Sequence, residues 1–375
     1  MKYRRFEKAG IDVSLLGFGA MRLPLREYPD TVDENEAIKM IRYAIDNGVN
    51  YFDTAYVYHS GEGERILGKA LKDGYRERVI LTTKLPYWAF NSPDQVENLL
   101  EEQLEKLGVS YVDFYLVHDI RTGCLQLVKK WKLWDLMSKK RDEGKARFLG
   151  FSSHCETPEE FKEILDAYPW EICQIQFNFM DKDKQAGLKG YEYAYSKGVP
   201  VIAMGPLKGG KLTDVLQPSI QKYWDSLETK RSPAEWALRW VADHPGVLTI
   251  LSGMTTMEQL KDNIRILAEA EACSLSEQEK NVIEKVAGEY RKLIKYQCTA
   301  CKYCLPCTAL INIPDIIDLR NSCDVYGISD NTRNYYSMWV DTKPTACTEC
   351  GKCETECPQH LEIIRAMKET AELLG

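Results

Sequence analysis

Two runs of cysteine near the C-terminal end of the sequence have spacings that suit metal or cluster binding. The sequence contains thirteen cysteines, and nine of them lie between residues 298 and 357. The runs are CTACKYCLPC, with Cys298, Cys301, Cys304 and Cys307, and CTECGKCETECP, with Cys347, Cys350, Cys353 and Cys357. Thiolates at such short, regular intervals are ligands for soft metal centres.

The second run favours a pair of iron–sulfur clusters. Its spacing, Cys-x2-Cys-x2-Cys-x3-Cys followed by Pro358, is that of bacterial ferredoxins, in which the fourth thiolate binds the other cluster. The first run is one residue shorter in its last gap and has Thr308 where a proline is expected. Crossing the fourth ligands predicts one 4Fe–4S cluster on Cys298, Cys301, Cys304 and Cys357, and a second on Cys347, Cys350, Cys353 and Cys307.

Two structural zinc ions are the alternative, because eight thiolates would also fill two zinc sites of four cysteines each. The third evenly spaced cysteine of each run suits a cubane corner but is redundant for a zinc site built from paired Cys-x2-Cys units. Cys323 lies between the runs and is expected to be a buried thiol. The other four cysteines have no partners at useful spacing.

Four polar residues stand at or just after the ends of apolar runs in the first third of the sequence. They are Asp53, Tyr58, Lys84 and His118. A tyrosine hydroxyl has a pKa of about 10, which a nearby ammonium lowers, and a carboxylate can hold that ammonium in place. A histidine beside them can orient a carbonyl oxygen or relay a proton. Alone, each residue is ordinary, but together they would protonate an oxygen as a carbonyl accepts a hydride.

The elements that must position these residues are eight short apolar runs, which we expect to be strands. They span residues 14–19, 50–55, 78–84, 112–118, 146–153, 173–178, 199–204 and 246–253. Continuously apolar strands are typical of a parallel sheet buried on both faces. Helical patterns fill the gaps, and three of them open with a hydroxyl residue followed by proline, at Ser92, Thr157 and Ser232.

Strand–helix alternation repeated eight times predicts an α/β fold, a (β/α)8 TIM barrel with reactive groups at the C-terminal ends of the strands. A doubly wound sheet is the weaker alternative. GFGAMR, at 17–22, has only two glycines of a dinucleotide-binding turn, and no helix follows it directly.

The barrel pattern ends after residues 254–270, and the sequence then predicts a second, smaller domain. A further helix opened by Ser276 should run to about Lys295 and lead into the cysteine segment. We therefore predict the barrel over 1–290 and a small, mainly α-helical ferredoxin-like iron–sulfur domain over 291–375. No low-complexity linker separates them, so we expect the tail to pack on the barrel.

Composition describes a globular protein without a broad attraction for polyanions. The net charge is −7, whereas nucleic acids and anionic membranes select basic patches. No apolar run of about 18 residues could span a membrane, and the N-terminal stretch lacks the apolar core of a signal peptide. We expect a cytoplasmic protein, in which grouped cysteines are ligands rather than disulfides.

Six segments resemble the aldo-keto reductases in order and spacing. They are YFDTAYVYHSGEGERILGKAL (51–71), LTTK (81–84), YLVHD (115–119), GFSS (150–153), QIQFN (174–178) and GMTTMEQLKDN (253–263). The resemblance covers about residues 3 to 270 and implies that Asp53, Tyr58, Lys84 and His118 are the catalytic tetrad, with Tyr58 as general acid. The cysteine tail is similar to the ferredoxin-like tails on one branch of that family.

The resemblance also implies a nicotinamide nucleotide site. Its expected residues are Ala20, Met21, Asp53, Ser152, Ser153, Gln174, Met204, Gly205, Pro206, Leu207, Lys208, Gly253, Gln259 and Asn263. Ser152 and Gln174 fall where the family hydrogen-bonds the nicotinamide carboxamide, and residues 204–210 where the backbone wraps the pyrophosphate.

Three departures from the family pattern bear on this site. Met204 replaces an aromatic ring that stacks on the nicotinamide, and Ser153 replaces an asparagine that binds the carboxamide. Gly253 and Gln259 replace a lysine and an arginine that bind the 2′-phosphate of NADPH. The cofactor is therefore expected to be NADP or NAD, with Lys208 or Lys211 as substitute phosphate ligands.

The leading interpretation is an oxidoreductase that moves a hydride between nicotinamide and a small aldehyde or ketone, or the matching alcohol. The alternatives are an electron-transfer protein that uses the barrel as a docking scaffold, and a redox sensor that binds nucleotide without turnover. Tyr58 and Lys84 together favour the enzyme. Clusters carry single electrons and no flavin signature is visible, so the clusters would serve an external electron carrier, sense redox state or hold the tail folded.

The substrate pocket is expected to have aromatic walls. The candidates are Tyr87, Trp88 and Phe90 after the third strand, and Tyr223 and Trp224 after the seventh. Aromatic residues in such loops are also common core residues, so the sequence leaves both interpretations open.

Overall fold

Eight parallel strands form a closed barrel in the order β10-β3-β4-β5-β6-β7-β8-β9. The strands are β3 Leu16–Gly19, β4 Tyr51–Asp53, β5 Ile80–Leu85, β6 Val112–Val117, β7 Ala146–Ser153, β8 Ile172–Gln176, β9 Val201–Met204 and β10 Val247–Ser252. The last strand pairs with the first through Ile250 and Leu16, so the sheet has no free edge. All eight predicted strands are confirmed, and the open doubly wound sheet is excluded.

The structure is a computed structural model that describes residues 1–26, 31–121, 123–213, 217–298 and 301–375. These residues form two compact units, one of residues 1–208 and 234–276 and the other of residues 209–233 and 277–375. None of the helices in the described ranges is both long and apolar enough to cross a membrane.

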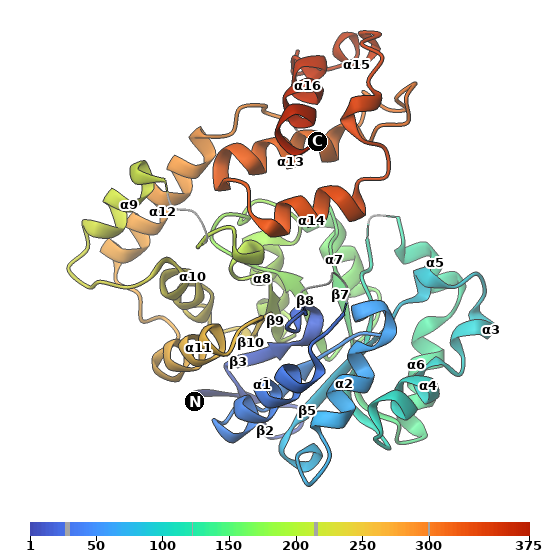
Figure 1. The fold of residues 1–375 in the computed structure, drawn as a ribbon. Helices are drawn as coiled ribbons and strands as arrows, with labels where there is room; N and C mark the ends of the chain where they lie inside the picture. Colours follow the sequence, from blue (N-terminus) through green and yellow to red (C-terminus); the bar gives the residue numbers. More distant parts are fainter. Residues whose placement is uncertain (27–30, 122, 214–216, 299–300) are drawn as a thin grey trace. The chain divides into compact units, whose positions relative to one another are not determined.

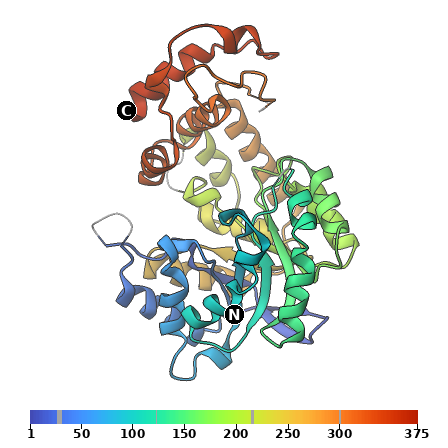
Figure 2. The same ribbon diagram turned by 90° about the vertical axis from the view of Figure 1, so that its right-hand side faces the viewer.

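Helices cover the outside of the barrel, as Figures 1 and 2 show from two directions. They are α1 Glu34–Asp46, α2 Gly63–Ala70, α3 Pro93–Val96, α4 Leu99–Leu107, α5 Leu125–Lys130, α6 Leu133–Asp142, α7 Pro158–Asp166, α8 Gly187–Ser196, α10 Pro233–Ala242 and α11 Met257–Glu269. The predicted start at Thr157 is confirmed, since its hydroxyl accepts a hydrogen bond from Glu160 N at 3.2 Å. At Ser92 the helix starts as predicted, but the hydroxyl makes no cap bond.

A short antiparallel hairpin, β1 Tyr3–Phe6 and β2 Ile11–Ser14, precedes the barrel and was not predicted. Its strands have four residues each, and they include the charged Arg4, Arg5 and Asp12, so their apolar pattern is weak. Phe6 and Val13 are buried with Tyr51 and Phe114 of the barrel strands. The hairpin therefore seals the apolar interior at the end where those strands begin.

In the described residues of the second unit, every regular element is a helix, and loops join the helices. Its helices are α9 Pro218–Asp225, α12 Glu277–Lys292, α13 Ile313–Tyr326, α14 Asp330–Trp339, α15 Lys352–Thr355 and α16 Ile363–Leu374. Helices α13 and α16 pack together, with Ile316, Ile317, Ile363 and Met367 in a core that also contains Cys357. The mainly helical tail agrees with the prediction.

The units divide the chain just before α12, whereas the predicted boundary lay near residue 290, close to the end of that helix. Helix α12 begins after Ser276 as predicted. Segment 209–233 belongs with the second unit because α9 packs against α12, and Tyr223 Oη donates to Glu289 Oε1 at 3.0 Å.

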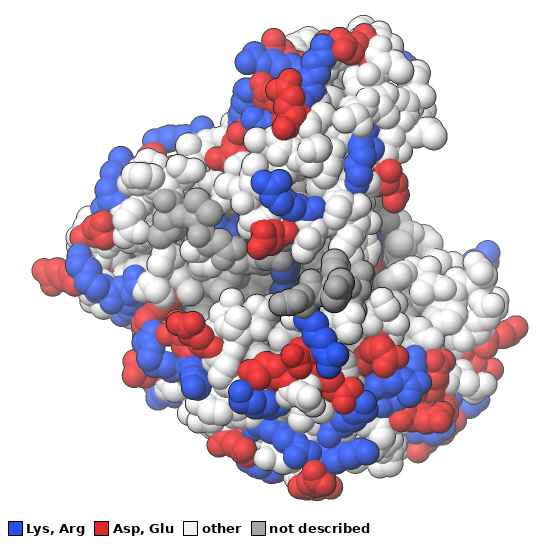
Figure 3. All heavy atoms as spheres, in the orientation of Figure 1, with Lys and Arg blue, Asp and Glu red and all other residues white. Residues whose placement is uncertain are grey.

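Acidic and basic side chains are interspersed on the face of the molecule drawn in Figure 3. Exposed charges of opposite sign form ion pairs, such as Lys69 with Glu34 and Arg78 with Asp46. Among the described residues drawn there, no broad basic patch of the kind that binds nucleic acid is visible.

Candidate functional site

Asp53, Tyr58, Lys84 and His118 come together at the C-terminal ends of three neighbouring barrel strands. Asp53 ends β4, Lys84 is next to last in β5, and His118 directly follows β6. Lys84 Nζ donates to Asp53 Oδ1 at 2.6 Å, to Thr54 O at 2.8 Å and to Tyr58 Oη at 3.3 Å. The Tyr58 and His118 rings meet edge to face, with centroids 6.0 Å apart.

Burial sets the electrostatics of this group. Burial disfavours the Lys84 ammonium, but the Asp53 carboxylate and the Tyr58 oxygen outweigh that effect and raise the pKa of Lys84. Burial also raises the pKa of Tyr58, more than the Lys84 charge lowers it, so the net direction is opposite to the expectation from charge alone. At neutral pH the site therefore holds a protonated phenol beside an ammonium.

His118 is electrically neutral in this site. Burial first, and then the charges of Lys84, His154 and Arg121, lower the pKa of His118 to about 2. Its Nδ1 is buried and has no hydrogen-bond partner among the described residues. A neutral imidazole carries one N–H, which can donate to a carbonyl oxygen but supplies no positive charge.

A buried network of hydrogen bonds fixes the backbone of Lys84 in β5. Gln103 Nε2 donates to Lys84 O at 3.0 Å and to Glu64 Oε1 at 2.7 Å. Thr83 Oγ1 also donates to Glu64 Oε1, and Tyr115 Oη donates to Gln103 Oε1. These side chains come from α2, α4, β5 and β6, so the network ties two covering helices to the strand that carries the lysine.

Residues of the loops after β5 and β6 lie beside His118. Trp88 donates its indole N–H to His118 O at 3.1 Å, and 47% of its surface is exposed. Asp119 has a positive φ of 58° and donates its N–H to Ser152 Oγ at 2.9 Å. Of the expected aromatic wall, Trp88 lies beside His118, whereas Tyr87 is buried, and Trp224 is buried in the second unit.

The residues expected to bind the nicotinamide differ in which of their hydrogen-bonding groups are already used within the protein. Gln174 is buried, and its Oε1 has no partner among the described residues, while its Nε2 makes only a 3.7 Å contact to Met204 Sδ. Ser152 Oγ accepts from Asp119 N and keeps its own proton to donate. Ser153 donates to Ile120 O at 2.6 Å, so its hydroxyl has no proton left for a carboxamide.

The segment expected to wrap the pyrophosphate follows β9. It comprises Gly205, Pro206, Leu207 and Lys208. Gly205 has a φ of +63° that favours glycine, and its carbonyl accepts from Asn178 Nδ2 at 3.2 Å. Lys208 Nζ is paired with the buried Asp181 at 2.7 Å.

The loops after β3 and β10 carry the remaining predicted nucleotide residues. Ala20 is buried and Met21 is exposed in the turn after β3, and Asn263 donates to Ser252 Oγ at 3.0 Å. Gln259 Oε1 accepts from Thr255 N at 2.9 Å, so this side chain caps the start of α11.

The two lysines expected to bind a 2′-phosphate, Lys208 and Lys211, both contact other side chains. Lys208 is held by Asp181, and Lys211 Nζ lies over the Tyr326 ring, 5.9 Å from its centroid, in the second unit. A side chain at Gly253 would begin 3.0 Å from Arg22 Cβ and Cδ. The aliphatic part of Arg22 therefore packs against the loop after β10.

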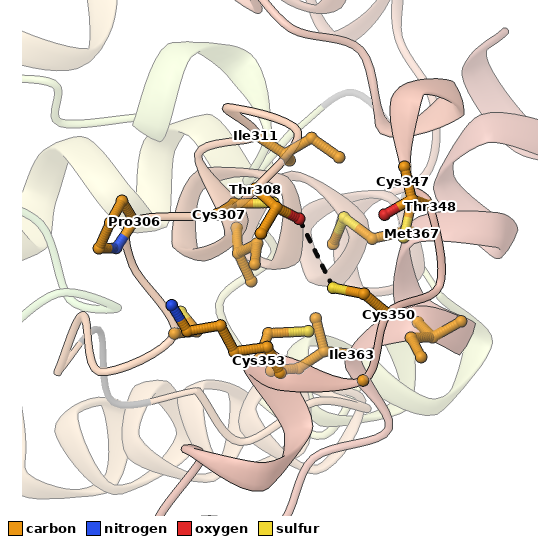
Figure 4. Close-up of a pocket in the computed structure, with 15 residues that line it drawn as sticks. Pro306, Cys307, Thr308, Ile311, Cys347, Thr348, Cys350, Cys353, Ile363 and Met367 are labelled. Atoms are coloured by element: carbon orange, nitrogen blue, oxygen red, sulfur yellow. Dashed lines mark hydrogen bonds between the residues drawn. The ribbon is translucent and has the colours of Figure 1, made fainter.

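The eight cysteines of the two runs line two cavities in the second unit. One is lined by Cys298, Cys301, Cys304 and Cys357, together with Pro314, Ile317 and Leu361. The other is lined by Cys307, Cys347, Cys350 and Cys353, by Cys304 on the shared side, and by Ile311, Ile363 and Met367 (Figure 4). The residues around each cavity include one of the two predicted crossed sets.

The cysteines surround these cavities rather than converge on a point. Among the residues described, no three or more His, Cys, Asp or Glu side chains are grouped closely enough to hold one metal ion. A zinc ion requires sulfur ligands about 2.3 Å from a single centre, whereas a cubane is bound at its corners. Cys323 is buried away from both linings, as expected.

Several site features were missed by the sequence analysis. Asp119 could have been found, because it is a polar residue directly after a strand end, the criterion that selected His118. Glu64 and Gln103 had no such signal, because their partners lie 19 and 20 residues away or more. The Thr54 carbonyl that holds Lys84 is a backbone group, which residue type does not reveal.

Comparisons with known proteins agree with this geometry. The sequence profile of the Aldo/keto reductase family matches residues 15–287. L-Galactose dehydrogenase of Arabidopsis thaliana is 27% identical over 313 residues, which cover 78% of this chain and 96% of that protein. Aldo-keto reductase YhdN of Bacillus subtilis is 27% identical, with 70% and 87% covered.

Solved structures give the same result. The holo form of aldo-keto reductase AKR11C1 from Bacillus halodurans superposes with a TM-score of 0.63 at 26% identity, covering 76% of this chain and 96% of its own. An aldo-keto reductase from Klebsiella pneumoniae in complex with NADPH shares the fold, with a TM-score of 0.61 at 23% identity, and covers 76% and 95%. The chain belongs to the aldo/keto reductase family and is an NAD(P)-dependent oxidoreductase.

Proposed function

We propose that this protein reduces a small aldehyde or ketone with NADPH or NADH, and oxidises the matching alcohol in the reverse direction. One observation carries the proposal: the buried Lys84 ammonium lies 2.6 Å from Asp53 and 3.3 Å from Tyr58. A protein that only docks a partner or binds nucleotide has no need of a buried phenol–ammonium–carboxylate set, so the scaffold and sensor alternatives are less well supported.

Each residue of this set has a distinct role. Tyr58 donates its proton to the substrate oxygen, and Lys84 stabilises the phenolate that this leaves. Asp53 holds Lys84, and the neutral His118 donates a hydrogen bond to the same oxygen and orients it. The nicotinamide, when bound, supplies the hydride.

The nucleotide site is proposed around Gln174, Ser152 and the backbone of residues 205–207. The unpaired Gln174 Oε1 and the Ser152 hydroxyl proton match the donor and acceptor of a carboxamide. Gly253 and Gln259 carry no charge, and Lys208 is already paired, so discrimination between NADPH and NADH should be weak.

We also propose that the tail binds two 4Fe–4S clusters with crossed fourth ligands. The cysteines around the two cavities support this assignment, as do the apolar side chains between them, because cluster sites combine thiolates with a dry surrounding. Bound clusters would carry single electrons to an external carrier. Cytoplasmic location remains part of the proposal, since free thiols in such number need a reducing compartment.

The first test is purification without oxygen, followed by iron analysis, nucleotide titration and a screen of carbonyl compounds. We expect about eight irons, NADPH and NADH dissociation constants within about 100-fold, or about 2.7 kcal/mol, and turnover with aldehydes or ketones. Nucleotide binding without oxidation by any carbonyl compound would instead support the sensor.

A further inference from the structure

Thr308 departs from the ferredoxin pattern, and carbonyl reduction does not explain this departure. It stands where a proline is expected after the fourth cysteine of the first run. In the structure its Oγ1 lies 3.5 Å from Cys350 Sγ, a cysteine of the second run (Figure 4). Both residues line the cavity that Cys307, Cys347 and Cys353 also line.

The direction of this hydrogen bond follows from the chemistry of a ligand. A thiol or a hydroxyl could each donate, but a cysteine bound to iron is a thiolate and has no proton. Thr308 must then be the donor and Cys350 the acceptor. Cys307 and Thr308 are adjacent, so the end of the first run gives the neighbouring cluster both its fourth ligand and a hydroxyl group.

We infer that Thr308 raises the reduction potential of the cluster bound by Cys347, Cys350, Cys353 and Cys307, by donating its hydroxyl proton to the Cys350 sulfur. The inference rests on the proposed clusters. Reduction adds negative charge that spreads onto the ligand sulfurs, and a donor stabilises the more negative form. Hydrogen bonds to cluster sulfurs are among the features that set such potentials.

The size of the effect is limited by exposure. Thr308 and Cys350 both lie at the solvent-exposed edge of the cavity, so water replaces part of a lost hydroxyl. We expect removal of the hydroxyl to change the one-electron equilibrium constant about three- to tenfold, the upper value being about 59 mV.

The test is a redox titration of the anaerobic full-length protein, followed by electron paramagnetic resonance. Thr308→Val removes the donor at nearly constant shape, and Thr308→Ser keeps it. Thr355→Val is the matched control, because the Thr355 hydroxyl belongs to the same cysteine segment but donates to Gly351 O at 3.3 Å. Iron is measured first in every sample.

We expect Thr308→Val to lower one of the two potentials and leave the other unchanged, while Thr308→Ser and Thr355→Val match the native protein. Should Thr308→Val lose iron, Thr308→Ala provides the same comparison. Two unchanged potentials, equal shifts in both, or an equal shift in Thr355→Val would overturn the inference. A native protein without iron would instead reject the clusters themselves, and carbonyl reduction is scored separately.

Discussion

At the residue scale, the site depends on a lysine that is entirely inside the protein. Lys84 is fully buried, and a buried ammonium is costly unless each N–H has a partner. Its three acceptors are the carboxylate of Asp53, the carbonyl of Thr54 and the phenol of Tyr58. The ammonium therefore has one fixed position, beside the Tyr58 oxygen.

Replacing Tyr58 with phenylalanine should remove most carbonyl reduction. The phenol is the proposed proton donor, and general acids contribute about 10²–10⁴-fold to the rate. The ring that packs against His118 remains, so the nucleotide dissociation constant should stay nearly unchanged. Steady-state kinetics and nucleotide titration on the same sample measure both quantities, and activity within threefold of the native protein would contradict the role of Tyr58.

The pH dependence of reduction should be set by Tyr58 and not by His118. The raised pKa of Tyr58 keeps the proton donor in place through neutral pH, and activity should fall only as pH rises through that value. The pKa of His118, about 2, lies far below this range. We expect kcat/KM for reduction to be level between about pH 6 and 9. A change in kcat/KM centred near pH 6.5 would mean that His118 titrates in that range and would contradict this prediction.

At the element scale, strand ends bring the reactive groups together and helix pairs hold the strands. Helices α2 and α4 pack closely on each other. Gln103 of α4 donates to the Lys84 backbone carbonyl in β5, and Glu64 of α2 accepts from the Thr83 side chain in the same strand. The close approach occurs at Gly68, where an added Cβ would lie 2.4 Å from Leu107 O. A backbone atom cannot move away cheaply, so this glycine fixes the distance between the helices.

Gly68→Ala should therefore destabilise the protein, even though alanine favours helix. Overpacking of this kind costs about 1–3 kcal/mol. Gly288 of α12 is the matched control, because an added Cβ there meets nothing within 4 Å. Gly288→Ala should be neutral or stabilising by up to about 1 kcal/mol. Thermal unfolding of both variants measures the difference, and equal effects would show that the contact at Leu107 is unimportant.

At the scale of the whole molecule, the chain combines a hydride-transfer unit with a cysteine-rich helical unit. The second unit has its own apolar core, and Glu369 ties its segments together through Lys295, Tyr296 and Arg320. The Lys295 hydrogen bond is the main cause that lowers the pKa of Glu369 to about 2. A cluster bound between cysteines 298–307 and 347–357 would link the same segments.

Cys357→Ala should damage the cluster of the first run rather than the one beside it in sequence. Cys357 lines the cavity of Cys298, Cys301 and Cys304, so its loss removes that cluster's fourth ligand. We expect about four of eight irons to be lost, with the spectrum of the other cluster retained. Iron analysis and electron paramagnetic resonance measure this, with Cys323→Ala as control. Loss of the cluster bound by Cys347, Cys350 and Cys353 would contradict the crossed assignment.

The sequence by itself determined the eight barrel strands, the positions of Asp53, Lys84 and His118 at strand ends, and the two cysteine runs. These features are local, because strand period, residue type and spacing along the chain express them directly. The hairpin at residues 3–14 was not predicted, because strands of four residues are too short to show a clear alternation of apolar and polar residues.

Only the tertiary structure decided how these residues interact. It reversed the expected direction of the Tyr58 pKa, because burial depends on residues from distant segments. In the folded chain Lys208 pairs with Asp181, and the Ser153 hydroxyl donates its proton to the Ile120 carbonyl. The tertiary structure also placed Thr308 beside Cys350, 42 residues away. Such contacts arise when separate elements pack together, and no periodicity within one segment records them.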